Sequence, residues 1–139
     1  MKKMITFYAS ACILNNVWGG TPYTPPATWY VGLSTQHVSS SGSNVLEPSA
    51  GAYARVAVTN NKSNFSVAAS GSLTNLTDIT FPESTSSWGT IQDVAIFDGS
   101  GPSANIWFYQ ALTSPRTVDV STTMSFSASA LTISMTNPS

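Results

Sequence analysis

The sequence carries very little charge. Five Lys and Arg residues and six Asp and Glu residues make up 8% of the 139-residue chain, and the formal net charge is -1. Because so few cations cannot neutralise a row of phosphates, we expect no nucleic-acid partner. A nearly neutral surface also protects a protein only weakly against association, which favours a chain that works inside an assembly.

Cysteine and long apolar runs are also scarce. Cys12 is the only cysteine, which excludes an internal disulfide framework and a zinc site built from several cysteines. No apolar run approaches the ~18 residues of a membrane-spanning helix, so we expect no membrane partner. The start, "MKKMITFYASACIL", imitates a secretory signal, but its apolar stretch is short and interrupted by Thr6 and Ser10. We therefore expect no signal peptide.

The inventory of reactive side chains does not predict a catalytic site. His37 is the only histidine, and it lies in a polar stretch without a nucleophile elbow. The carboxylates are scattered singly, without the spacing of a metal site or of a paired acid and base. We expect no enzyme activity, no metal and no cofactor. The alternative, an esterase-like hydrolase, would need His37 within hydrogen-bonding reach of a serine and an acid.

The start of the chain contains a helical pattern. Apolar residues recur at steps of three and four, which predicts a helix over 4–18 that ends at two glycines. Two interpretations of the apolar stripe remain open: the helix lies on the body of its own domain, or it docks on a neighbouring chain. The residues of the stripe are Met4, Phe7, Ala11, Leu14 and Trp18.

The rest of the chain alternates short β-type runs with turn residues. A strand is predicted over 28–34, followed by a long surface loop, "QHVSSSGSNVLEPSAG". Asp98 is predicted to serve a hairpin turn, "DGSG", in which Gly99 or Gly101 adopts a positive φ. The later predicted strands are "YARVAVT", "NFSVA", "DITFP", "IQDVAIF", "NIWFYQAL", "RTVDV", "TMSFSA" and "ALTISMT".

Roughly eight or nine short strands without a second helix predict an all-β fold. We expect an antiparallel jelly-roll-like β-sandwich with one short N-terminal helix. It would form a single domain over 1–139, with a helical segment over 1–20 and the sandwich over 28–137. The residues expected in the core are Val31, Leu33, Val56, Val58, Phe81, Val94, Ile96, Phe97, Leu131 and Ile133.

The stretch "IWFYQ" places three aromatic residues next to one another in a predicted strand. Since alternate side chains of a strand face opposite sides, Trp107, Phe108 and Tyr109 cannot all face one layer. This indicates a second buried surface, which a subunit interface would supply. The residues predicted to bind a partner are Phe7, Leu14, Trp18, Trp107 and Tyr109.

Four short motifs occur in an order that resembles a known family. The motifs are Tyr53-Ala54-Arg55, Phe81-Pro82, Trp88-Gly89-Thr90 and Ile96-Phe97-Asp98. Their order is similar to that of a family of small tailed-phage virion proteins, often labelled tail fibre protein and including jelly-roll cement proteins of the capsid. The resemblance covers nearly the whole chain.

The resemblance implies a virion structural protein. We expect a capsid decoration or cement protein on the outer surface of the phage head, which bridges subunits of the major capsid protein. The protein itself would form a homodimer or a higher symmetric oligomer. The alternative is a tail fibre or a tail-associated carbohydrate-binding adhesin, whose groove would place Trp or Tyr beside Asn, Asp or Gln.

Overall fold

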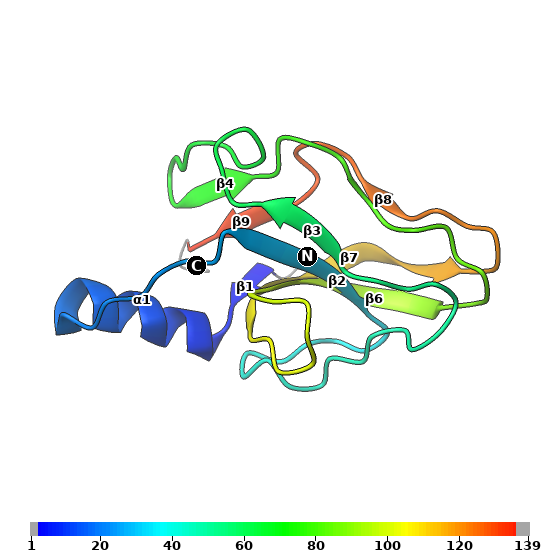
Figure 1. The fold of residues 1–139 in the computed structure, drawn as a ribbon, viewed down its shortest axis with the longest axis horizontal. Helices are drawn as coiled ribbons and strands as arrows, with labels where there is room; N and C mark the ends of the chain where they lie inside the picture. Colours follow the sequence, from blue (N-terminus) through cyan, green and yellow to red (C-terminus); the bar gives the residue numbers. More distant parts are fainter. Residues whose placement is uncertain (1–2, 136–139) are drawn as a thin grey trace.

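The chain forms antiparallel β structure with one helix (Figure 1). A computed structural model describes residues 3–135. The strand pairs in this range are antiparallel. The elements of this range are, in chain order, β1 (Lys3–Ile5), α1 (Phe7–Gly19), β2 (Thr28–Ser34), β3 (Val56–Thr59), β4 (Ser72–Thr74), β5 (Ile79–Thr80), β6 (Gly89–Phe97), β7 (Ile106–Val118), β8 (Ser125–Phe126) and β9 (Thr132–Ser134).

The largest sheet has five strands in the order β1-β7-β6-β2-β3. Strand β6 lies at its centre, between β2 and β7. Ile91 and all residues from 93 to 97 are buried. The nearly continuous apolar run of "IQDVAIF" is what a strand covered on both faces requires.

The two faces of this sheet are covered by different parts of the chain. On one face, the two-stranded sheets β4-β9 and β5-β8 complete a sandwich around the main core. On the other face, Val38 and Val45 of the 35–50 loop pack against Ala95 and Phe97. The second surface that the sequence assigned to a subunit interface is therefore buried by the chain's own loop.

A β-bulge in β7 sets the direction of the aromatic run. Ile96 pairs with Phe108 but Phe97 pairs with Ile106, so Trp107 is an extra residue in the strand. Phe108 enters the main core, whereas Ile106 joins the cluster under the 35–50 loop. The bulge thus places Ile106 on the same face of the sheet as Tyr109, whereas regular alternation would put these two residues on opposite faces.

The predicted antiparallel β-sandwich with one short N-terminal helix is confirmed. The residues predicted in the core are buried except Val56 and Ile133, which are half-buried and pack against the core. Period-two alternation was sufficient for this result, because residues on one face of a strand share one environment.

Two local predictions were wrong. Met4 does not belong to the helix, because residues 3–5 pair with β7 and the helix begins at Phe7. The run "NFSVA" does not form a regular strand: Phe65 makes only an isolated bridge with Asn75, directly after a turn in which the Asn61 side chain accepts the N–H groups of Ser63 and Asn64. A strand that the sequence analysis missed, β4, follows at Ser72–Thr74.

The "DGSG" turn differs from its prediction in backbone conformation. Neither Gly99 nor Gly101 has a positive φ, because the connection from Phe97 to Ile106 is long enough to turn with ordinary dihedrals. Asp98 does serve the turn, since its carboxylate accepts the N–H of Asn105 at 2.8 Å and the Asn105 amide at 3.0 Å.

Truncation of Ile96 tests the core. Ile96 is 5% exposed and belongs to the main core, so Ile96→Ala is expected to lower the free energy of unfolding by about 2 to 5 kcal/mol. Urea denaturation measures the change. Val120→Ala, at a 59% exposed position, is the control and is expected to stay within about 0.5 kcal/mol. A loss below about 1 kcal/mol for Ile96→Ala would contradict the assigned packing.

Candidate functional site

The base of α1 is fixed to strand β7 through Thr6. This side chain is fully buried. Its hydroxyl accepts the N–H of Ala9 at 3.2 Å, as an N-cap does, and donates to the carbonyl of Ile106 at 2.6 Å. The Thr6 N–H donates to the carbonyl of Trp107 at 3.1 Å. One residue therefore sets the direction in which the helix leaves the sheet.

The other end of α1 is closed by glycine. Gly20 has a φ of 63°, in the left-handed region, and its N–H donates to the carbonyl of Asn15. The following segment contains three prolines, which keep it extended. It places Tyr23 and Pro25 beside Cys12 of the helix. The helix is thus capped at both ends, and the proline-containing segment that follows it packs against one of its sides.

Helix α1 extends past the end of the sandwich and has two different faces (Figure 1). Ala9 is buried and Ile13 is half-buried on the side of the domain. On the other side Phe7, Leu14 and Trp18 are 66%, 55% and 78% exposed. The helix sequence, "FYASACILNNVWG", contains no charged residue. We term Phe7, Leu14 and Trp18 the outer stripe.

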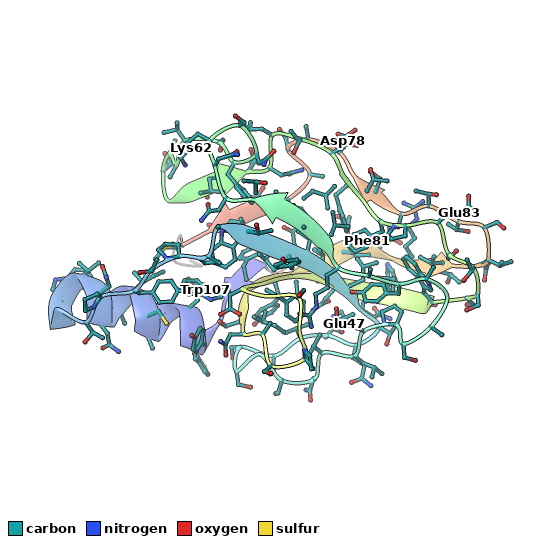
Figure 2. All side chains as sticks on the ribbon, in the orientation of Figure 1. Glu47, Lys62, Asp78, Phe81, Glu83 and Trp107 are labelled. Atoms are coloured by element: carbon teal, nitrogen blue, oxygen red, sulfur yellow. The ribbon has the colours of Figure 1, made fainter. Side chains whose placement is uncertain are left out.

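Trp107 lies at the centre of an aromatic cluster between α1 and the sheet (Figure 2). Its ring centroid lies 5.9 Å from that of Tyr8, 4.9 Å from that of Tyr23 and 5.4 Å from that of Trp29. Its indole N–H faces Asp98 Oδ2 at 3.4 Å. Burial, and then the charge of Asp98, raises the pKa of Tyr23 to about 12. The cluster supports the inner side of the helix.

An apolar groove opens at the same end of the sandwich, between the base of α1, the five-stranded sheet and β4-β9. Its volume is about 410 Å³. Ile5 and Ile13 line it near the helix, and Leu73 and Ile133 line it on the side of the small sheet. We term it the end groove. Its polar residues are Asn60, Asn61, Lys62 and Ser134.

The imidazole of His37 pairs with a buried aspartate. His37 Nδ1 lies 2.7 Å from Asp93 Oδ1, and Asp93 Oδ2 accepts the N–H of Val38 at 2.8 Å. The Asp93 side chain is 2% exposed, whereas that of His37 is 70% exposed. The carboxylate therefore fixes the 35–50 loop to β6. In the described part of the chain no hydrogen bond joins His37 to a serine hydroxyl, which the hydrolase alternative requires.

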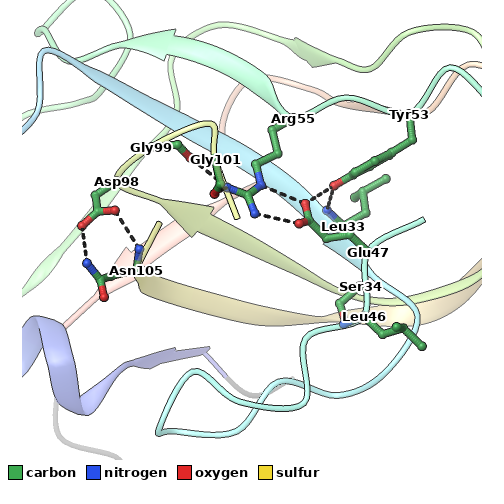
Figure 3. A network of polar contacts seen from close by, with 10 residues as sticks. All are labelled: Leu33, Ser34, Leu46, Glu47, Tyr53, Arg55, Asp98, Gly99, Gly101 and Asn105. Carbon is green, nitrogen blue, oxygen red and sulfur yellow. Dashed lines mark hydrogen bonds and ion pairs between the residues drawn. The ribbon is translucent and has the colours of Figure 1, made fainter. Parts of the chain in front are cut away.

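Arg55 joins three segments of the chain (Figure 3). Its guanidinium donates to both carboxylate oxygens of Glu47, at 2.9 and 2.7 Å. It also donates to the carbonyls of Gly99 and Gly101, at 2.8 and 3.0 Å, and lies 3.5 Å over the ring of Phe97. A planar cation with five donors can make these contacts at once. The 35–50 loop and the "DGSG" turn are therefore held by one side chain.

Tyr53 completes this network above Gly32. The Tyr53 hydroxyl donates to Glu47 Oε1 at 2.7 Å and accepts the N–H of Leu33 at 2.8 Å. Burial, and then the hydrogen bond to Glu47, raises the pKa of Tyr53. A Cβ at Gly32 would lie 2.8 Å from Glu47 Oε1 and from the Phe97 ring, so the close approach requires glycine.

Over residues 3–135, no group of three or more His, Cys, Asp or Glu side chains is placed to hold a metal ion. The helix found in that range is too short to cross a bilayer.

Nearly the whole chain matches one known protein family. Residues 4–134 match the family described as Podophage GP4 fiber I protein gp80. The chain belongs to this family. It is a family of phage virion proteins, often labelled fibre, and the resemblance found in the sequence is confirmed. No curated protein matches the chain. The family match spans the outer stripe, the Arg55 network and the residues that line the end groove except Met135.

The structure separates the residues that were predicted to bind a partner. Phe7, Leu14 and Trp18 are exposed together on α1. Trp107 is half-buried by the aromatic cluster. Tyr109 is 4% exposed and lies in the cluster under the 35–50 loop, so it does not share a surface with Phe7, Leu14 and Trp18. Tyr109 pairs with Ala95, and both side chains belong to that cluster.

Removal of the Arg55 guanidinium tests the network. Its side chain is 10% exposed, so Arg55→Met would leave the Glu47 carboxylate without its cation and lower the free energy of unfolding by about 3 kcal/mol. Adding Glu47→Gln is expected to restore part of this loss, because the unpaired charge is then removed. Urea denaturation of both variants measures the difference. A double variant less stable than Arg55→Met would contradict this account.

Proposed function

We propose that the protein is a structural subunit of a phage fibre, without enzyme activity, that assembles through the outer stripe of α1. The observation that carries this proposal is an uncharged helix that leaves the sandwich with Phe7, Leu14 and Trp18 in water. A helix on a soluble monomer ordinarily turns such residues toward its own core.

The exposed apolar area on α1 is large for so small a chain. An aromatic side chain buries roughly 150 to 250 Å² when it is covered. Phe7 and Trp18, at 66% and 78% exposure, therefore leave on the order of 300 Å² in water. With Leu14 beside them, the patch reaches the size that marks an interaction site. Covering it would contribute roughly 1.5 to 3 kcal/mol for each large side chain.

The family description favours a fibre over a capsid cement protein. The resemblance alone implied either location, and the matching family is described as a fibre protein. The adhesin alternative required Trp or Tyr beside polar side chains in a groove. The end groove has Trp29 and Trp107 near Asn60 and Asn61, but its remaining walls are mainly aliphatic and phenyl side chains. Such walls favour an apolar protein segment over a sugar.

The polar clusters support a role without chemistry. Asp93 is hydrogen-bonded to the Val38 N–H and to His37, and Glu47 is paired with Arg55. These side chains hold loops in place. A hydrolytic role would also require a nucleophile beside the His37 imidazole. We therefore propose that the protein acts through contact surfaces.

Replacement of the outer stripe tests the assembly role. Phage carrying Phe7→Ser with Trp18→Ser is expected to contain far fewer copies of the protein, because the association loses two apolar anchors and weakens by more than about a hundredfold. Quantitative immunoblotting of purified particles gives the copy number. The control is Val120→Ser, at an exposed position away from α1. Full occupancy by a folded double variant would overturn the assembly role.

The position of the protein on the particle tests the fibre role. Gold-labelled antibody against the protein is expected to bind at the fibres of intact virions. Label distributed over the head shell would overturn the fibre assignment in favour of capsid decoration. The distinction does not depend on the stripe variants, so location and assembly are tested separately.

A further inference from the structure

The outer stripe and the end groove are two apolar features that no other part of residues 3–135 covers. The stripe lies on the side of α1 that faces away from the domain. The groove lies at the base of the same helix, where Ile5 and Ile13 form part of its wall. We infer that the outer stripe of one copy docks into the end groove of a second copy. This inference rests on the proposed role of α1 as an assembly surface.

A chain cannot fill its own groove with its own stripe. Ile13 of α1 lines the groove, whereas Leu14 and Trp18 lie on the other side of the helix. The buried hydrogen bonds of Thr6 to Ile106 and Ala9 fix the base of the helix. The helix cannot rotate its stripe into the groove without breaking this anchor, so the stripe must come from another molecule.

The chemistry of the two surfaces is complementary. The stripe is apolar, and the groove offers Leu73, Ile133 and Met135 along one side. Met135 is 59% exposed, so this wall is open to a partner. Helix α1 has no basic residue in its last turn, where the helix dipole leaves negative charge. Lys62 on the groove rim would supply that cation from the second copy.

The symmetry of the contact favours a second copy over a different protein. When each of two copies inserts its helix into the groove of the other, both stripes and both grooves are covered by a single two-fold arrangement. Stripe-to-stripe packing of two helices would cover the stripes but leave both grooves open to water. A single partner chain of another kind would need one apolar site to cover the outer stripe and a second apolar segment to fill the end groove.

A mixing experiment tests the inference with two variants at exposed positions. Trp18→Ser removes the stripe anchor and keeps the groove. Met135→Lys places a charge in the groove, beside Lys62, and keeps the stripe. Each purified variant is first shown to be folded by circular dichroism. The control is Val120→Lys, at a position with the same 59% exposure as Met135. Masses in solution are measured by light scattering after size exclusion.

We expect the wild type and Val120→Lys to form dimers or larger closed oligomers, and each of the two test variants alone to be monomeric. An equimolar mixture of the variants is expected to form a one-to-one pair, because the intact stripe of one meets the intact groove of the other. Failure of the mixture to associate would overturn the inference, and so would self-association of Met135→Lys, which indicates stripe-to-stripe packing.

The results that would overturn docking between copies differ from those that would overturn the proposed function. A wild-type protein that is monomeric in solution, together with loss of the stripe variant from virions, would overturn docking between copies and leave the assembly role standing. Association in solution together with label on the head shell would support the docking and overturn the fibre role.

Discussion

The extra residue in β7 determines how the rest of the molecule is arranged. Because Trp107 is inserted between the partners of Ile96 and Phe97, the side chains before and after it face opposite layers. Phe108 thus lies in the main core, whereas Ile106 lies under the 35–50 loop together with Tyr109. The carbonyls at this bulge also receive the hydrogen bonds of the helix anchor. The aromatic cluster, the groove and the direction of α1 all follow from this one irregular pairing.

Four of the eleven charged residues of the chain hold the fold together. Asp93 fixes the 35–50 loop to the sheet, Asp98 closes the hairpin before β7, and Glu47 with Arg55 joins both regions. Charges held in this way contribute little to keeping molecules apart in solution. The surface therefore consists mainly of hydroxyl, amide and apolar groups. The low charge of the sequence is thus also a low charge of the surface.

Local patterns predicted the layers of the fold but not its contacts across the chain. The strand at 28–34 and the buried run of β6 follow from alternation and β-branched composition, which each segment carries by itself. The pair of His37 and Asp93 is separated by 56 positions, and no spacing rule connects them. The placement of Ile106 on the face of Tyr109 could not be predicted for a related reason, because a bulge reverses the alternation and has no signature in "IWFYQ".

The motif Tyr53-Ala54-Arg55 carries a sequence signal for the polar network. Alternation in this extended segment before β3 places Tyr53 and Arg55 on one side, where a hydroxyl donor and a guanidinium can share one acid. Glu47, the nearest carboxylate along the chain, is that acid. The candidate assembly surface was more accessible to sequence reasoning, because the helical period of α1 already separated its outer stripe from its inner face.

The sheet edges explain why a helix, and not a strand, is suited to carry assembly in this fold. The edge strands of the large sheet are β1 and β3, with three and four residues. The part of β7 beyond β1 is interrupted by Pro115, which has no N–H to offer a new strand. Short and interrupted edges discourage open-ended pairing between molecules. A helix that inserts side chains into a groove has a defined register, and the contact closes into a pair when two copies exchange helices about a two-fold axis, whereas strand pairing would continue from one copy to the next.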